Sequence, residues 1–235
     1  MRTTIFSLIL FVSSLSNVFA EENKFLQEYI DVIKSNDLNK IEEKIMEFQE
    51  RTEKFSRSLV ELIEKETDLD KKAWLIYLTG SLKLEFTTGE LIRNLEFVHI
   101  KPQADSFSRN RHSTFPVQNA LAQIGMSTLK YLINEITERE YNYPDILLLR
   151  TIRTVIYCNV DYVDSVQLAK LILEGYYKEE EDPKGKENLK KAIELISQEN
   201  YLEQERAYQK KECRKAYEEY KKQQKNEVKP ETANP

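Results

Sequence analysis

The chain has few of the residues that usually carry catalytic or metal-binding chemistry. Its 235 residues include five glycines, two cysteines, two histidines and one tryptophan. None of the motifs G-x-x-x-x-G-K-[ST], G-x-S-x-G, H-E-x-x-H or C-x-x-C occurs. The sequence therefore gives no support for a phosphate-binding loop, a serine-hydrolase elbow or a zinc site. We expect a protein that is not an enzyme and that holds no metal and no cofactor.

Long apolar runs are missing after the first 20 residues. Those residues combine Arg2, the apolar run "IFSLILFVSSLS" and the closing "VFA", a pattern typical of a cleaved export signal. The apolar run is shorter than the about 20 residues that a membrane-spanning helix needs. We predict cleavage after Ala20, a secreted or periplasmic location, and no transmembrane segment in the mature chain.

Charge of one sign does not dominate the chain. Lysine and arginine number 35, aspartate and glutamate number 40, and the net charge is −5. A mildly acidic balance argues against nucleic acid as the main partner, and it excludes little else.

The two cysteines allow two interpretations. In an oxidising compartment Cys158 and Cys213 could form one disulfide. Alternatively, Cys158 follows "TVIY" on an apolar helix and could be a small buried residue. Cys213 lies in the charged stretch "KKECRKAY", where packing explains it less easily.

Apolar residues recur at three- and four-residue spacing, which predicts an all-α protein. The first elements are a helix pair over residues 22 to 67 and then a helix with its apolar face on Trp74, Leu75, Leu78 and Leu82. The stretch "TTGELIRNLEF" follows as another helix. Thr87 and Glu90 have the spacing of a capping box at its start.

The stretch "FPVQNALAQIGMSTLKYLINEI", residues 115 to 136, predicts two helices rather than one. Thr114 or Phe115 can be the N-cap, so that Pro116 falls in the first turn, where its missing N–H is tolerated. Gly125 then ends the first helix in a left-handed C-terminal cap. Ser127 is expected to cap the second helix. The result is a helical hairpin with Gly125 at its corner.

The same pattern predicts a second hairpin further along the chain. Pro144 opens its first helix and Asn159 ends it, while Asp161 and Asp164 start a second helix that Gly175 ends. One long helix is then expected from about residue 186 to 224. Residues 225 to 235 have the composition of a disordered tail.

Residues 115 to 139 resemble a HEAT or armadillo-type repeat. The resemblance rests on the initial proline, the short helix "NALAQIG", the glycine turn and the following "LKYLINEI". It implies stacked antiparallel helical hairpins in a short α-solenoid that binds partners on a concave face, usually without catalysis. The domain organisation is then a repeat domain over residues 21 to 199 and an extended charged helix over 200 to 224.

Residues 98 to 114, "VHIKPQADSFSRNRHST", interrupt the helical pattern. A loop this long inside a compact domain is more often functional than inert, and its charged residues give it +2 on an acidic protein. Such a patch could recruit an anionic partner, although the same charges could simply keep a mobile loop in solution. Two exposed histidines with Asp105 between them are too few for a zinc site. The candidate partner-binding residues are His99, Lys101, Arg109, Arg111 and His112.

These observations favour an exported, non-catalytic helical-repeat protein that acts as an interaction module or scaffold for another protein. The alternative is an enzyme on an all-α scaffold, with His99 or His112 beside a buried carboxylate near the 98–114 loop. A third hypothesis is a structural protein that self-associates through the helix at residues 200 to 224.

Overall fold

The structure is a computed structural model that describes residues 59–99, 114–138 and 145–227, together with Lys24, Glu28, Asp31, Lys40 and Glu43. The predicted signal segment, most of the helix pair over 22–67 and residues 100–113 of the predicted loop lie outside the described residues. The chain divides into two compact units, Met1–Leu78 and Thr79–Pro235. This division falls inside the range 21–199 that the sequence predicts as one repeat domain.

The described part of the chain is helical, as predicted, and no strand occurs in it. Short 3₁₀ turns, η1 and η3, lead into α4 and α6. The elements are α3 (Leu69–Ser81), η1 (Glu85–Thr87), α4 (Thr88–Arg93), α5 (Pro116–Ile124), η3 (Met126–Thr128), α6 (Leu129–Glu138), α7 (Asp145–Asn159), α8 (Ser165–Glu179), α9 (Pro183–Ile196) and α10 (Tyr201–Glu227).

In the first unit, residues 59–65 are helical and most of α3 follows them. Leu59 and Ile63 are fully buried, four residues apart on one helix face. The predicted apolar face of α3 is buried at Trp74, Leu75 and Leu78. Trp74 also meets Tyr77 edge to face, with ring centroids 5.6 Å apart, a favourable aromatic geometry.

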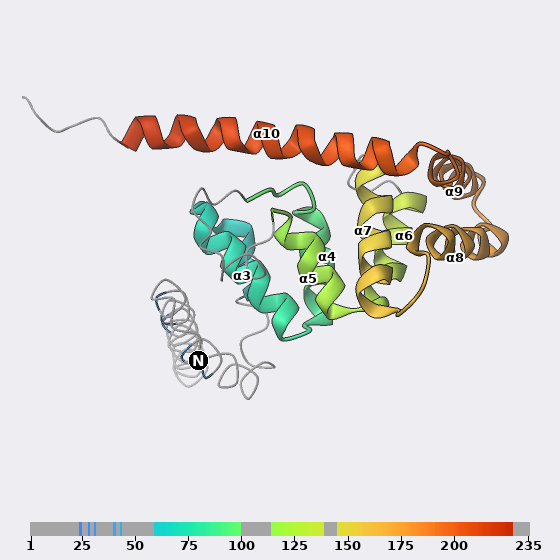
Figure 1. Cartoon of the computed structure of the whole chain (residues 1–235). Coiled ribbons are helices and arrows are strands. Elements are labelled where there is room, and N and C mark those ends of the chain that lie inside the picture. Colours follow the sequence, from blue (N-terminus) through green and yellow to red (C-terminus); the bar gives the residue numbers. More distant parts are fainter. Residues whose placement is uncertain are drawn as a thin grey trace, which may run out of the picture. The chain divides into compact units, whose positions relative to one another are not determined.

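The second unit is built around α7, which contacts α5, α6, α8, α9 and α10 (Figure 1). A helix covered on several sides needs apolar residues around most of its circumference. The run "ILLLRTIRTVI" supplies them, because every residue from Leu147 to Ile152 is buried, as are Val155 and Ile156. The apolar residues of this helix thus face inward, and the buried arginine at position 150 was not predicted.

The end of α3 that belongs to the second unit approaches α5 closely at Gly80. A Cβ atom added to Gly80 would lie 2.7 Å from the Cα atom of Ala120, well inside van der Waals contact. Glycine is therefore required there for close backbone approach.

Gly125 ends α5, as predicted, but not in the expected left-handed cap. Its φ of 113° and ψ of −164° lie in an extended region that only glycine enters readily. The predicted Ser127 cap is also wrong, because η3 precedes α6 and the Thr128 hydroxyl donates to the Gly125 carbonyl at 2.8 Å. Both helices contact α7 more than they contact each other.

The predicted capping box at Thr87 and Glu90 does not form. Because η1 leads directly into α4, Thr87 already has helical φ and ψ angles and its hydroxyl donates backwards to the Leu84 carbonyl at 2.7 Å. The Glu90 carboxylate instead accepts from the Asn94 amide at 2.6 Å.

The boundaries of α7 and α8 agree with the sequence except at one end. Asn159 ends α7, and the Asp164 carboxylate caps α8 by accepting from the backbone N–H groups of Val166 and Gln167. Gly175 does not end α8, which continues to Glu179. A glycine inside a helix costs about 1 kcal/mol relative to alanine, too little to stop a helix that is anchored by the buried Leu173.

The single helix predicted from about 186 to 224 is wrong, because two helices occupy this range. Asp182 caps α9, with its carboxylate accepting from the Gly185 backbone at 2.7 Å. The chain leaves the helix after Ile196 and begins α10 at Tyr201. The intervening "SQEN" contains serine and asparagine, whose side chains compete with helical hydrogen bonds; the Ser197 hydroxyl donates to the Ile193 carbonyl at 2.6 Å.

Candidate functional site

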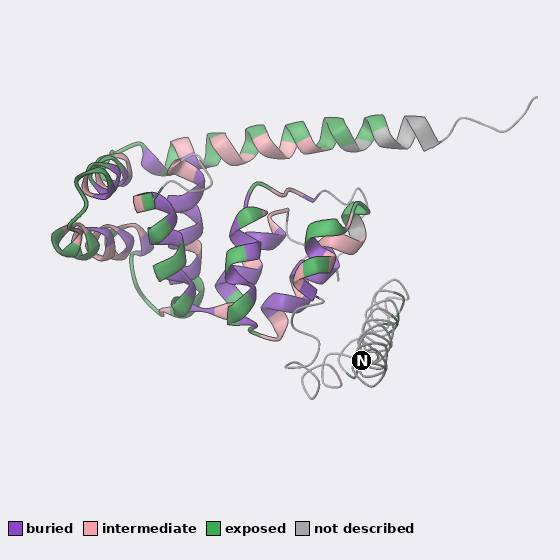
Figure 2. Ribbon diagram, turned by 180° about the vertical axis from the view of Figure 1, so that it is seen from behind, coloured by how far each residue is buried: buried purple, intermediate pink, exposed green. Residues whose placement is uncertain are grey.

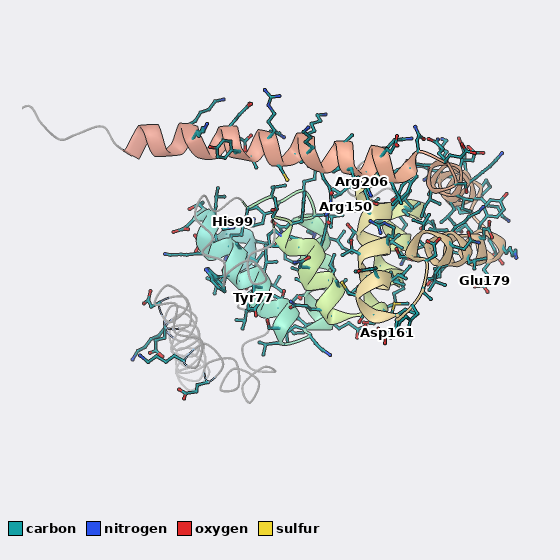
Figure 3. All side chains as sticks on the ribbon, in the orientation of Figure 1. Tyr77, His99, Arg150, Asp161, Glu179 and Arg206 are labelled. Carbon is teal, nitrogen blue, oxygen red and sulfur yellow. The ribbon has the colours of Figure 1, made fainter. Side chains whose placement is uncertain are left out.

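The junction of α7 and α10 holds three charged side chains, of which Arg150 and Glu205 are buried and Arg153 is half-buried. Arg150 and Arg153 lie three residues apart on one face of α7, and Glu205 lies in the first turns of α10. Only 8% of Arg150 and 3% of Glu205 is exposed. We call this group, together with Gln118, Gln209 and Ser165, the arginine–glutamate cluster (Figure 3).

Arg153 and Glu205 form a two-pronged ion pair between α7 and α10. The guanidinium donates from Nε to Glu205 Oε2 at 2.9 Å and from Nη2 to Oε1 at 2.5 Å. Its third side, Nη1, donates to the Ser165 hydroxyl at 3.2 Å. A bidentate pair of this kind is among the stronger and more directional contacts in proteins, so it fixes both the position and the rotation of α10.

Arg150 connects three helices. Its Nη1 donates to the Gln118 amide oxygen on α5, and its Nε lies 3.8 Å from Glu205 Oε1. With its amide oxygen turned toward α7, Gln209 accepts from Nε and Nη2 of the same guanidinium. The guanidinium also stacks over the Phe115 ring, 4.1 Å from the ring centroid. This cation–π contact supports a buried cation on its apolar side.

Burial and mutual charge shift the proton affinities of the cluster. Burial lowers the pKa of Arg150, while Glu205 acts in the opposite direction. The hydrogen bond to Glu205 raises the pKa of Arg153. Burial raises the pKa of Tyr201, and the Glu205 carboxylate raises it further. The raised pKa values of Arg153 and Tyr201 favour a charged guanidinium and a neutral phenol at these two residues.

The cluster acts as an anchor for α10. Its donors point at protein acceptors, and both oxygens of Glu205 accept from Arg153. One buried and one half-buried cation are matched by one buried anion, and removing one partner from such a group is strongly destabilising. One buried donor of the cluster, Gln118 Nε2, has no hydrogen-bond partner among the described residues, which adds to the cost of the arrangement.

Beyond this anchor, α10 is mostly exposed. In its first two turns Tyr201 and Glu205 are buried, and from Arg206 to Glu219 the helix alternates between exposed and intermediate residues (Figure 2). Five basic side chains between residues 206 and 215 are all exposed, and Arg206 is labelled among the α10 side chains in Figure 3. We call them the outer basic face: Arg206, Lys210, Lys211, Arg214 and Lys215.

The outer basic face is not neutralised by its own helix. Residues 206–215 contain five cations and one carboxylate, Glu212, for a net charge of +4 on a chain of −5. Arg214 pairs with Glu218 at 3.2 Å. Within the described residues, no salt bridge connects Arg206, Lys210, Lys211 or Lys215 to a carboxylate. The face therefore presents a strong local positive potential.

The partner-binding residues expected from the sequence belong to neither of these two groups. Lys101, Arg109, Arg111 and His112 lie outside the described residues. His99 is described and 6% exposed, so the expectation of an exposed histidine was wrong at this position. Its backbone N–H donates to the Thr114 carbonyl at 3.1 Å, and this bond joins the two ends of the predicted loop. Its ring lies 6.4 Å from that of Phe97.

Both cysteines lie in the described part of the chain, and both are free thiols. The disulfide considered between Cys158 and Cys213 is therefore not formed. The alternative for Cys158, a small buried residue, is also wrong, because it lies near the end of α7 and is exposed.

Sequence reasoning missed the arginine–glutamate cluster, although a signal was present. Arg150 and Arg153 interrupt the run "ILLLRTIRTVI", which is apolar on every face, and an arginine in such a helix is rarely buried without a partner. The sequence therefore indicated that an anion was needed. It did not indicate that Glu205, 52 residues after Arg153, would supply it.

Comparison with known proteins gives no family assignment. No family model matches this chain, and no curated protein or solved structure matches it. Among the described residues, no group of three or more His, Cys, Asp or Glu side chains is placed to hold a metal ion. Helices in the same part of the chain lack the combination of length and apolar character that crossing a membrane requires.

Proposed function

We propose that this protein is a non-catalytic helical interaction module that uses α10 to bind another protein. The observation that carries the proposal is the contrast along α10. Its first turns are held by a buried cluster of charges, while the following turns are exposed and carry unmatched positive charge. A helix that is fixed at one end and exposed along the rest is suited to recognition, because its orientation is set before a partner arrives.

The remaining parts of the proposal come from the sequence. The first 20 residues support export to a secreted or periplasmic location. The likeness of residues 115–139 to a HEAT or armadillo-type repeat supports a short solenoid, in which helices stack and leave one face for partners. The central position of α7, packed between α5, α6, α8, α9 and α10, is compatible with helices stacked in successive layers.

Site-specific photo-crosslinking in the full chain tests the proposal. A photoreactive residue at position 211, on the outer basic face, should give a discrete adduct with another protein in the producing cells. The same residue at position 190, exposed on α9, is the matched control and should give no such adduct. Glu205→Gln, which breaks the anchor, should weaken the adduct at position 211.

Two results would contradict the proposal. Equal crosslinking at positions 190 and 211 would show that α10 is not the recognition element. An adduct at position 211 with twice the mass of the chain would show that the partner is a second copy, as in the hypothesis of self-association.

A further inference from the structure

We infer that the outer basic face of α10 binds a short acidic segment of a partner protein, with carboxylates at helical spacing. This inference rests on the proposed function and specifies the chemistry of its partner. It depends on the charge, spacing and boundaries of the face.

The spacing of the basic residues fits a linear array of carboxylates. Arg206, Lys210 and Arg214 follow one another at four-residue intervals, about 6 Å apart along the helix axis, and Lys211 and Lys215 form a parallel row. A partner helix with glutamates at four-residue intervals has the same axial repeat. Pairs formed in this way across two helices resemble the flanking ion pairs that set partner choice in coiled coils.

The basic stretch is bounded by acidic residues. Glu203 precedes it and Glu218 and Glu219 follow it, and all three are exposed. The five cations therefore span only about 14 Å of the helix. A long polyanion such as duplex DNA, or a charged membrane surface, would extend past these boundaries and meet the carboxylates. A short acidic segment would not.

The side chains around the face also argue against a lipid surface. Amphipathic helices that lie in a membrane interface present large apolar residues beside their cations. Between Arg206 and Lys215 the exposed positions hold the five cations and one alanine, Ala207. Exposed large apolar residues, Leu202 and Tyr217, lie only outside this stretch, so residues 206–215 offer mainly electrostatic attraction, which a complementary acidic segment exploits most fully.

Peptide binding to the full chain tests the inference. The probe is a fluorescent alanine-based peptide of about three helical turns with glutamates at four-residue intervals. The comparison peptide has glutamine at the same positions. Fluorescence anisotropy at low salt should show that the glutamate peptide binds at least about tenfold more tightly, and added salt should weaken this binding because the charges are exposed.

Two charge-reversed variants locate the binding site. Lys210→Glu/Arg214→Glu should weaken binding of the glutamate peptide by about tenfold or more. Lys190→Glu/Lys191→Glu on α9 changes the net charge by the same amount and should weaken it by less than about twofold. Circular dichroism establishes that both variants keep the helical content of the parent, so that a loss of binding is not a loss of folding.

Three results would overturn the inference: equal affinity for the two peptides, equal losses in the two variants, or tighter binding to phosphatidylserine vesicles or duplex DNA than to the glutamate peptide. The crosslinking experiment separates this failure from failure of the proposed function. An adduct at position 211 without peptide binding rejects only the acidic segment. Loss of both rejects the interaction module as well.

Discussion

Helices α9 and α10 are consecutive and both rich in lysine, yet different forces hold them. The inner face of α9 is mainly apolar, with Leu189, Ala192 and Ile196 buried. Two of its outer lysines are neutralised in place, because Lys190 pairs with Glu194 and Lys191 with Glu187. In contrast, α10 is anchored by a buried ion cluster, and its outer cations mostly lack partners among the described residues.

The difference indicates separate roles: α9 packs to complete the fold, whereas α10 is held by the fold with its outer side exposed. The lysines of α9 take part in local pairs that suit a solvated face and add little stability. The cations of α10 repel one another along the helix, and this repulsion lowers its stability unless an anionic partner is bound. Experiments that act on one helix and spare the other can therefore break or sharpen the comparison.

The largest effect is expected when the anchor of α10 loses its anion. Glu205→Gln keeps the shape of the side chain but leaves the buried Arg150 and the half-buried Arg153 without a counter-charge. We expect a loss of about 3–5 kcal/mol in the free energy of unfolding, measured by urea denaturation. Hydrogen exchange should also show early opening of α10 relative to α9.

The control for this variant is Glu203→Gln, which removes an exposed carboxylate two residues away on the same helix. It should change the free energy of unfolding by less than about 0.5 kcal/mol. Equal losses in the free energy of unfolding for both variants would show that the buried Glu205 does not anchor α10.

A somewhat smaller loss is expected from the apolar side of α9. Leu189 is fully buried, and Leu189→Ala should cost about 3 kcal/mol through lost burial and the cavity that remains. Because no charge is involved, this loss should not change with salt concentration. Leu202→Ala, at a residue 40% exposed on α10, should cost far less in the same urea experiment. A salt-dependent loss at Leu189 would weaken the contrast between the two helices.

High pH should weaken the attachment of α10 through Tyr208. Burial raises the pKa of Tyr208 to about 12, with Glu212 and then Glu96 adding to the shift. In the unfolded chain a tyrosine ionises near pH 10. The contribution of Tyr208 to the free energy of unfolding is therefore complete below about pH 10. It is lost as the pH approaches 12, because the unfolded chain releases the tyrosine proton at a lower pH than the folded chain does.

The measurement is the free energy of unfolding as a function of pH for Tyr208→Phe. This variant should lose less stability than the parent between about pH 10 and 12. Tyr217→Phe, at an exposed tyrosine on the same helix, should follow the parent curve. The same slope in all three proteins would contradict a protected phenol at position 208.

The sequence was sufficient to predict several helix ends of the second unit but not its polar interior. Pro116, Gly125, Asn159 and Asp164 mark helix ends that depend on backbone preferences, and these ends are where the sequence placed them. Gly175 shows the limit of such rules, because tertiary packing carried α8 past a residue that disfavours helices.

The polar cluster could not be derived in full because its members are distant in the sequence. Gln118 precedes Arg150 by 32 residues and Glu205 follows Arg153 by 52. Periodicity shows that Arg150 is on a buried helix, but the identity of its partners depends on how α5 and α10 pack on α7. The break at Ser197–Asn200 was missed for a different, local reason. Side-chain hydrogen bonds to the backbone there are only slightly more favourable than continuation of the helix.

The smallest effect on stability should come from the outer basic face itself. Lys210→Glu/Arg214→Glu removes one exposed pair, Arg214 with Glu218, and relieves part of the repulsion among the remaining cations. We expect the free energy of unfolding to change by less than about 0.5 kcal/mol, which urea denaturation at low and high salt can resolve. Lys190→Glu/Lys191→Glu breaks two pairs on α9 and should be at least as destabilising. If instead the α10 variant lost more than about 1 kcal/mol while the α9 variant did not, the outer basic face would stabilise the fold, and its charge would no longer require a partner to explain it.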